Sequence, residues 1–302
     1  MAIFCPILSL IYLSFGDSEG LWTHLLESVL GRYVSTTVAL MLGVSCLTLL
    51  FGVTTAWIVA AYQFRFSKLL DMVILLPIAC PAYLVAYAYT DFFEYAGPVQ
   101  GALRDMMGWK TARDYYFPEI RSLGGAIFVL SSVLYPYVYL LSRTAFRHIP
   151  ASFYEVAAIS NRNVFWNICL PLARPAIVAG LALVCMEVVS DFGTVEFFSL
   201  ETLTLGIFNV WIGMNNITAA AQISTFTFIF IILLLLTEMY SRSRKRFNDT
   251  SRKQTVAKPK IVTGFKAVLL YVVCLTPVIF GFVTPAAILL WNVVKSADMA
   301  AF

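Results

Sequence analysis

The stretch YEVAAISNRNVFWNICLPLARPAI, Tyr154–Ile177, is the most polar run in the middle of a very apolar chain. It starts with residues that form helices readily, reaches Leu170-Pro171, and carries a second proline at Pro175. Proline lacks a backbone N–H and clashes with the preceding turn, so Pro171 predicts that a helix ends or changes direction there. We therefore expect a short helix along one surface of the protein, with an ordinary connecting loop as the alternative.

The composition predicts an all-α, polytopic membrane protein. Hydrophobic residues make up 60% of the chain and charged residues 13%, whereas about a quarter of a soluble domain is charged. Several apolar runs approach the ~20 residues that a helix needs to cross a bilayer, and lipid favours helices because each satisfies its own backbone. The expected spans are 34–62, 69–89, 123–141, 175–195, 217–240 and 267–294. A short helix over 1–15, for which a signal peptide is the alternative, brings the number to about seven membrane helices.

Lysine and arginine placement predicts which end of the bundle faces the cytoplasm. The cytoplasmic set is Arg65, Lys68, Arg143, Arg147, Arg162, Arg174 and the basic linker 241–266. The outer set is Arg32, Arg104, Lys110, Arg113, Arg121 and Lys295, mostly in one long loop. This orientation puts the polar stretch on the cytoplasmic face, and it puts Asp71 at a cytoplasmic helix end, where we expect a solvated side chain.

The segment after the basic linker suggests an internal repeat. The residues from Pro285 loosely echo those from Pro6, as if the chain were starting again, and such repeats are common in transporters. The expected organisation is therefore a short first helix and outer segment (1–30), a first transmembrane half (31–240), a cytoplasmic linker (241–266) and the first helix of a second, incomplete half (267–302).

The polar stretch resembles a motif of a known family. Glu155-Val156-Ala157-Ala158, followed by Ile168-Cys169-Leu170-Pro171, is similar to the EAA loop of ATP-binding-cassette importer permeases. The resemblance implies the type I ABC-importer transmembrane fold, with the loop forming the helix that couples to a separate ATPase subunit. The coupling residues that it implies are Glu155, Ala157, Ala158, Asn161, Ile168, Leu170 and Pro171.

Other segments resemble the ferric-iron permeases of the bacterial inner membrane. They are LLPIACPAYLVAYAY (75–89), GPVQ (97–100), FPEIRS (117–122), LYPYVYLLSRTAF (134–146) and MEVVSDFGTVEFF (186–198). This resemblance implies import of ferric iron, although thiamine and phosphonate permeases are near relatives. It also implies three protein partners: an ATPase that acts as a dimer, a periplasmic substrate-binding protein, and either a second permease half or an identical copy.

The chain departs from the family pattern in one respect. The distance from Glu155 to Pro171 is about three residues shorter than usual, and Asn161 stands where the family has glycine. The alternatives left open are a truncated, non-functional permease and a self-sufficient channel or ion-coupled carrier. A channel, however, has no use for a docking helix.

The chain carries no motif for energy supply or catalysis. It has no G-x-x-x-x-G-K-[ST] run to hold ATP phosphates, and no nucleophile next to a base. We expect no enzyme activity, cofactor, metal site or nucleic-acid partner in this chain, and contact with lipid along its spans.

Two further groups of residues are candidates for transport. Carboxylates inside apolar spans are costly unless they face a cavity or partner, which makes Glu187 and Asp191, four residues apart on one expected helix face, pathway candidates. Phe192-Gly193-Thr194 follow, and glycine could let the helix end bend. In the outer loop, we expect Arg104, Lys110, Arg113 and Arg121 to dock the binding protein. The tyrosines near span ends are expected in aromatic belts.

Overall fold

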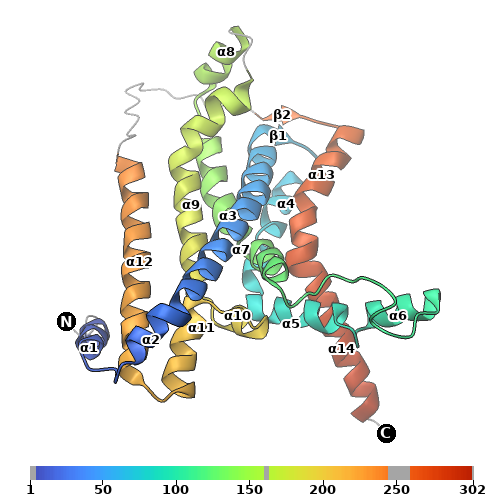
Figure 1. The fold of residues 1–302 in the computed structure, drawn as a ribbon. Helices are drawn as coiled ribbons and strands as arrows, with labels where there is room; N and C mark the ends of the chain where they lie inside the picture. The colour runs from blue at the N-terminus through green and yellow to red at the C-terminus, as the bar shows by residue number, and fades with distance from the viewer. Residues whose placement is uncertain (1–4, 160–162, 244–258, 301–302) are drawn as a thin grey trace.

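Helices make up nearly all of the described chain (Figure 1). The computed structural model describes residues 5–159, 163–243 and 259–300. The first helices are α1 (Cys5–Ser14), α2 (Leu21–Ser28), α3 (Leu30–Ala61), α4 (Ser67–Val73), α5 (Ala82–Phe93), α6 (Pro98–Met107) and α7 (Leu123–Arg147). They are followed by α8 (Ala151–Ile159), α9 (Leu170–Ser190), α10 (Gly193–Phe197), α11 (Leu203–Phe208), α12 (Ile217–Ser243), α13 (Phe265–Val278) and α14 (Thr284–Ala300).

Short irregular segments connect several of these helices. A 3₁₀ turn, η2 (Leu76–Ala79), precedes α5, and π-helical turns are found at η3 (Phe165–Cys169), η4 (Asn209–Gly213) and η5 (Ile279–Val283). The two residues that follow α3 form β1 (Tyr62–Gln63). This strand pairs in parallel with β2 (Lys260–Ile261), which lies in the described part of the expected linker 241–266. The all-α class predicted from composition is confirmed.

The core lies where α7 packs between α3 and α9. These helices are apolar on most faces, so they bury side chains against each other, including Val44, Tyr135, Val138 and Val184. Small residues allow the close approach, since Gly52 of α3 and Gly180 of α9 both lie against Val138 of α7. This three-helix contact positions the segments that carry the candidate sites.

The described chain holds four helices that are long and apolar enough to span a membrane. They cover Leu30–Ala61, Leu123–Arg147, Phe165–Ser190 and Phe265–Lys295. A bent pair, Ser67–Ala79 with Ala82–Met107, makes a fifth if it is counted as one broken span. These helices do not confirm the count of about seven.

The span expected as one helix over 69–89 is broken. Its two parts meet at an angle of 83° between Ala79 and Ala82. Pro77 lies in the 3₁₀ turn and Pro81 precedes α5, so two prolines within five residues interrupt the α-helical hydrogen bonds. The prediction of a continuous helix here was wrong.

Pro171 does not end a helix. The segment Phe165–Ser190 is one continuous span, in which Pro171 stands in the first turn of α9 directly after the π-turn η3. The N–H of Leu170 donates to the carbonyl of Phe165, five residues earlier, and this wider spacing makes room for the proline ring. The span therefore begins about ten residues before the expected 175, and it ends at Ser190.

The last span packs against the helices of the expected first half. α13 contacts α3, and α14 contacts α5. The Tyr89 hydroxyl donates to the Phe280 carbonyl across this contact, at 2.6 Å. The proposed division at residues 240 and 267 remains a prediction.

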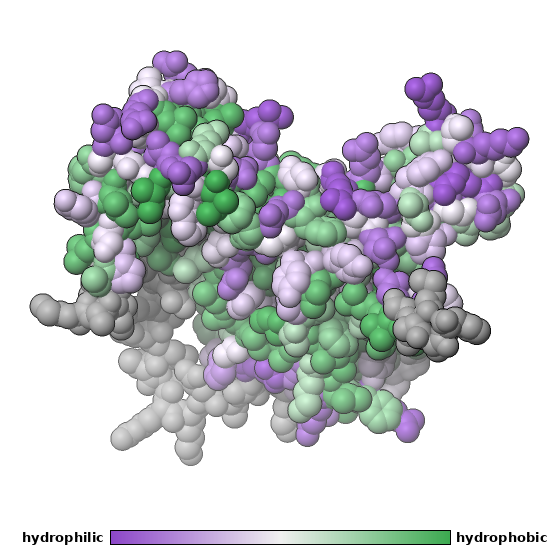
Figure 2. All heavy atoms as spheres, turned by 90° about the horizontal axis from the view of Figure 1, so that it is seen from below, coloured by the Kyte–Doolittle hydropathy of each residue, from purple (hydrophilic) through white to green (hydrophobic). Residues whose placement is uncertain are grey.

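The two ends of the bundle differ in character. Figure 1 shows α8, β1 and β2 at one end, and α2, α6 and α11 at the other. Seen from the second end, hydrophilic side chains gather on projecting parts of the surface, with hydrophobic side chains between them (Figure 2). Among the described residues, Arg143 and Arg147 lie at the end of α7 next to α8, whereas Arg104 lies on α6 at the other end of the bundle.

Candidate functional site

The predicted coupling loop projects from the bundle as a separate helix. α8 extends beyond the ends of α7 and α9 (Figure 1). Glu155 lies on α8 with its side chain exposed. Ala157 and Ala158 belong to the same helix, whereas Asn161 lies outside the described residues. Ile168, Leu170 and Pro171 belong instead to the start of the next span.

The base of this loop is held by a cluster of three aromatic side chains. Trp57, at the end of α3, packs against Phe146 of α7 at 5.5 Å between ring centroids, and against Phe165 of η3 at 5.1 Å. Phe146 precedes α8 and Phe165 follows it, so one tryptophan joins both ends of the loop. A second contact is 3.6 Å long, between the Cys169 thiol and the Tyr154 hydroxyl of α8.

Sequence reasoning missed this aromatic cluster. Trp57 was assigned only to a span, and Phe165 to a surface helix. The only signal in the sequence is that aromatic residues flank the polar stretch on both sides, which does not specify their partner more than 80 residues away. The cluster fixes where α8 leaves the bundle.

Asp71 is not the solvated side chain that we expected. Its carboxylate on α4 accepts hydrogen bonds from Tyr139 and Arg143 of α7, and from Arg147 at 3.2 Å. The Asp71 side chain is only 14% exposed. Three donors from α7 shield the Asp71 carboxylate. Because these donors are far from Asp71 along the chain, the sequence did not predict the contact.

Glu187 lies on the exposed side of α9. Its carboxylate has a long contact of 3.5 Å with the Tyr137 hydroxyl of α7. A charged group on the surface of a membrane span is costly in lipid, so a partner or an aqueous path must cover this face. The position fits the pathway role that was predicted for Glu187 and leaves that role a prediction.

Asp191 does not share a helix face with Glu187. α9 ends at Ser190, and Asp191 has an extended backbone with ψ at 120°. Its carboxylate accepts hydrogen bonds from the backbone N–H of Thr194 at 2.8 Å and of Val195 at 3.3 Å. Asp191 thus stabilises the first turn of α10 by satisfying N–H groups that have no helical partner.

The bend at the end of α9 comes from Asp191 and not from Gly193. Gly193 is not among the glycines with positive φ, so its conformational freedom is not used. It accommodates a neighbour instead, because a side chain there would approach the Cβ of Tyr83 to 3.1 Å. Phe192 packs on Phe208 of α11 at 4.8 Å, and Thr194 is buried. This segment therefore joins α9, α5 and α11.

The tyrosines do not form one aromatic belt. Tyr83 and Tyr87 are about half exposed near the outer end, as a belt requires. Tyr89, Tyr135 and Tyr139 are buried, and their hydroxyls donate to Phe280, Ile74 and Asp71. A buried hydroxyl needs a partner, and each of these three has one.

The four basic residues expected to dock a binding protein fall into two groups. Arg104 donates to the Tyr95 carbonyl at 2.8 Å and lies over the Tyr95 ring, and Arg121 pairs with Glu94. These two side chains hold the outer loop together. Lys110 and Arg113 are exposed and remain available to a partner.

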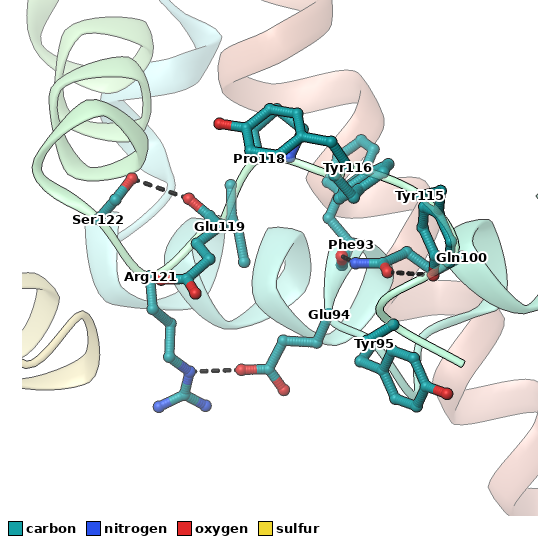
Figure 3. A pocket seen from close by; sticks show the side chains of 13 residues that line it. Phe93, Glu94, Tyr95, Gln100, Tyr115, Tyr116, Pro118, Glu119, Arg121 and Ser122 are labelled. Atoms are coloured by element: carbon teal, nitrogen blue, oxygen red, sulfur yellow. Dashed lines mark hydrogen bonds and ion pairs between the residues drawn. The ribbon is translucent and has the colours of Figure 1, made fainter.

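Between these contacts the outer loop forms a pocket of about 760 Å³ (Figure 3). Its floor includes Gln100, which accepts a hydrogen bond from Tyr115 and donates to the carbonyl of Phe93. On the far side of the loop, the backbone N–H groups of Thr111 and Lys110 donate to Asp114 and hold the pKa of its carboxyl below the ordinary value. The loop is thus internally bonded, which lets it present Lys110 and Arg113 at fixed positions.

Comparison with known proteins gives the following relatives. The family described as binding-protein-dependent transport system inner membrane component matches residues 48–246. A putative 2-aminoethylphosphonate transport system permease protein of Salmonella paratyphi A is 28% identical over 183 residues, which are 58% of this chain and 62% of the relative. An Fe(3+)-transport system permease protein of Haemophilus influenzae is 23% identical over 63% of this chain and 34% of the relative.

The match to solved structures concerns the fold. A bacterial ABC transporter involved in the import of the acidic polysaccharide alginate contains a chain that matches with a TM-score of 0.60 at 16% identity. The match covers 82% of this chain and 90% of that one, and it shows the type I ABC-importer transmembrane fold. The curated relatives are named permease proteins rather than enzymes, and this chain spans about three fifths of the phosphonate relative's length.

The family match extends over most of the core helices, the predicted coupling loop and the segment that carries Glu187. The family is described as an inner-membrane component, which agrees with the long apolar helices described above. Because the match covers well over half of the chain, this protein belongs to the family of binding-protein-dependent transport system inner membrane components.

Proposed function

We propose that this chain is the permease component of an ATP-driven importer that moves a small substrate from the periplasm to the cytoplasm. The observation that carries the proposal is α8, a short helix that projects from one end of the bundle, with Glu155 exposed. A projecting helix with an anchored base can fit into a groove on a partner protein. The partner proposed here is a separate ATPase subunit that acts as a dimer.

The exposed position of Glu187 supports a second permease unit. A lone carboxylate on a membrane-facing surface is unfavourable, and a second half or an identical copy across an aqueous path would cover it. In this arrangement Glu187 and the partly exposed Tyr83 and Tyr137 line the path near its outer end. Asp191, Phe192, Gly193 and Thr194 fix the shape of that end, and Asp191 does so through its bonds to α10.

For the substrate we propose a cation, with ferric iron as the specific candidate. The named relatives transport different substrates, since they include permeases for 2-aminoethylphosphonate, sulfate and Fe(3+). A carboxylate and phenol oxygens on the path attract a hard cation and repel an oxyanion. The chemistry of Glu187 therefore favours the iron permease among these relatives.

Uptake into proteoliposomes tests the function and the substrate together. The vesicles contain the permease, its ATPase and its binding protein, and they receive radiolabelled ferric iron, sulfate or 2-aminoethylphosphonate in separate runs. We expect uptake of iron that requires ATP. Uptake without the ATPase would support a channel or carrier instead, and uptake of an oxyanion alone would overturn the proposed cation.

Glu187→Gln should lower uptake about tenfold while ATP hydrolysis continues. Glutamine keeps the volume and hydrogen bonding of the side chain but removes the charge. The free energy that corresponds to a tenfold loss of uptake is smaller than the Coulomb attraction between a cation and a nearby carboxylate. The measurement compares iron uptake with ATP hydrolysis in the same vesicles. Glu27→Gln, an exposed change on α2, is the matched control, and wild-type uptake by Glu187→Gln would exclude the pathway role.

Neutralising Lys110 and Arg113 together should slow binding of the periplasmic protein by about tenfold at low salt. Exposed charges at the rim of an interface mainly set the association rate and its salt dependence. Association is measured at low and high salt by surface plasmon resonance. Arg32→Gln is the control, because Arg32 already pairs with Glu201 at 2.8 Å. An unchanged rate at low salt would exclude docking through these two residues.

A further inference from the structure

Three side chains of α7 converge on the single carboxylate of Asp71. The donors Tyr139, Arg143 and Arg147 are four residues apart, so they lie along one face of the helix. They bring the last two turns of α7 against α4, and both Asp71 and Arg143 are largely shielded from solvent. We call these four residues the Asp71 cluster.

The short helix α4 is also held at its C-terminal end by the buried Ile74, whose carbonyl accepts a hydrogen bond from the Tyr135 hydroxyl of α7. The helix is seven residues long and begins after Phe66, whose φ of +61° marks a sharp turn. Leu70 is buried, but Leu69 and Met72 are exposed. Within α4 itself, the charge-assisted hydrogen bonds of Asp71 attach the helix to the last two turns of α7. Removing the carboxylate would also leave two neighbouring guanidinium groups without a counter-charge.

The end of α7 in turn holds α8. Arg147 is the last residue of α7, and α8 begins at Ala151. Phe146, the residue before it, packs against Trp57 and Phe165. The last turn of α7 is therefore fixed by two separate contacts, an aromatic one to α3 and η3 and an ionic one to α4.

We propose that Asp71 is a positioning residue for α8. By fixing the last turns of α7, it sets the direction in which α8 leaves the bundle and meets its partner. The inference rests on the proposed function only for the identity of that partner, the ATPase. The position of α8 itself is measurable in the permease alone.

Hydrogen exchange tests the positioning role directly. The full chain is placed in phospholipid nanodiscs, and amide exchange is followed by mass spectrometry for wild type and Asp71→Asn. We expect exchange to rise about tenfold in α4, the end of α7 and α8, because bonds to charged groups are lost there. Exchange in α6 should not change. Glu94→Gln is the matched control, since it breaks an ion pair of the outer loop and should leave α8 unchanged.

Tyr139→Phe provides a milder test in case Asp71→Asn does not fold. It removes one donor and keeps both arginine pairs. Exchange in α8 should therefore rise only two- to threefold, because losing a neutral hydrogen-bond donor destabilises the contact less than losing the carboxylate charge does. An equal rise over the whole chain in both variants would show a general stabilising role and overturn the proposal. Unchanged exchange in α8 would also overturn it.

A second readout connects the position of α8 with transport. In vesicles that contain the complete importer, Asp71→Asn should raise the number of ATP molecules hydrolysed per substrate severalfold, whereas a merely unstable protein would lose both activities together. The two proposals fail separately. If α8 does not bind the ATPase, the number of ATP molecules hydrolysed per substrate stays constant in Asp71→Asn. The rise in amide exchange in α8 is still observed in that case.

Discussion

We expect Glu155→Lys to abolish ATP-driven uptake and to leave the chain folded in the membrane. Glu155 is exposed on a helix that projects from the bundle, so its replacement costs little folding free energy. At an interface, however, reversing a charge replaces an attraction with a repulsion, which costs several kcal/mol. Uptake in proteoliposomes and co-purification of the ATPase should both be lost.

The control for this change lies at the other end of the molecule. Glu27→Lys also reverses an exposed glutamate on a short helix, and Figure 1 places its helix, α2, far from α8. It should retain uptake and the ATPase. Undiminished uptake by Glu155→Lys, with the protein present at wild-type amounts, would refute the assignment of α8 as the coupling helix.

The sequence predicts the class of the fold well because membrane helices are a local property. An apolar run must satisfy its own backbone in lipid, so the spans that contain α3, α7 and α13 can be recognised without knowing their neighbours. The break at Pro77 and Pro81 is also a local property, because each proline interrupts the helix in which it stands. We overlooked these two prolines because the apolar run around them predicted a continuous span. The continuous helix through Pro171 could not be predicted, because it depends on the π-turn that precedes it.

The candidate sites were predictable only where a residue acts through its exposed position. Glu155 and Glu187 are exposed as their predicted roles require. Asp71 was misjudged because its partners lie elsewhere in the chain, and a charge that is paired inside the protein looks the same in a sequence as a free one. The contacts of Arg104 and Arg121 within the outer loop were missed for the same reason, and their docking role stays a prediction. Asp191 did carry a local signal, since an aspartate three residues before Thr194 is typical of a helix start.

Gly52→Leu should prevent the chain from reaching its folded state. A Cβ at Gly52 would lie 2.7 Å from the Cβ of Val138 and 3.0 Å from the carbonyl oxygen of Tyr135. Neither can retreat easily, because Val138 is held from the other side by Gly180, where a Cβ would meet its Cα at 2.8 Å. Separating α3 from α7 would open the core contact on which the spans depend. Size-exclusion chromatography in detergent should show aggregated protein or none.

Gly31 supplies the control on the same helix, because a Cβ there would meet no atom within 4 Å. Gly31→Leu should therefore fold. The corresponding alanine variants make the test sharper, since alanine favours a helix interior over glycine by about 1 kcal/mol, and the first turn, where Gly31 lies, by less. Gly31→Ala should raise the melting temperature, whereas Gly52→Ala should lower it, because overpacking costs about 1–3 kcal/mol and outweighs the gain in helix propensity. If both alanine variants were stabilised, the close contact between α3 and α7 could not be what holds these helices together.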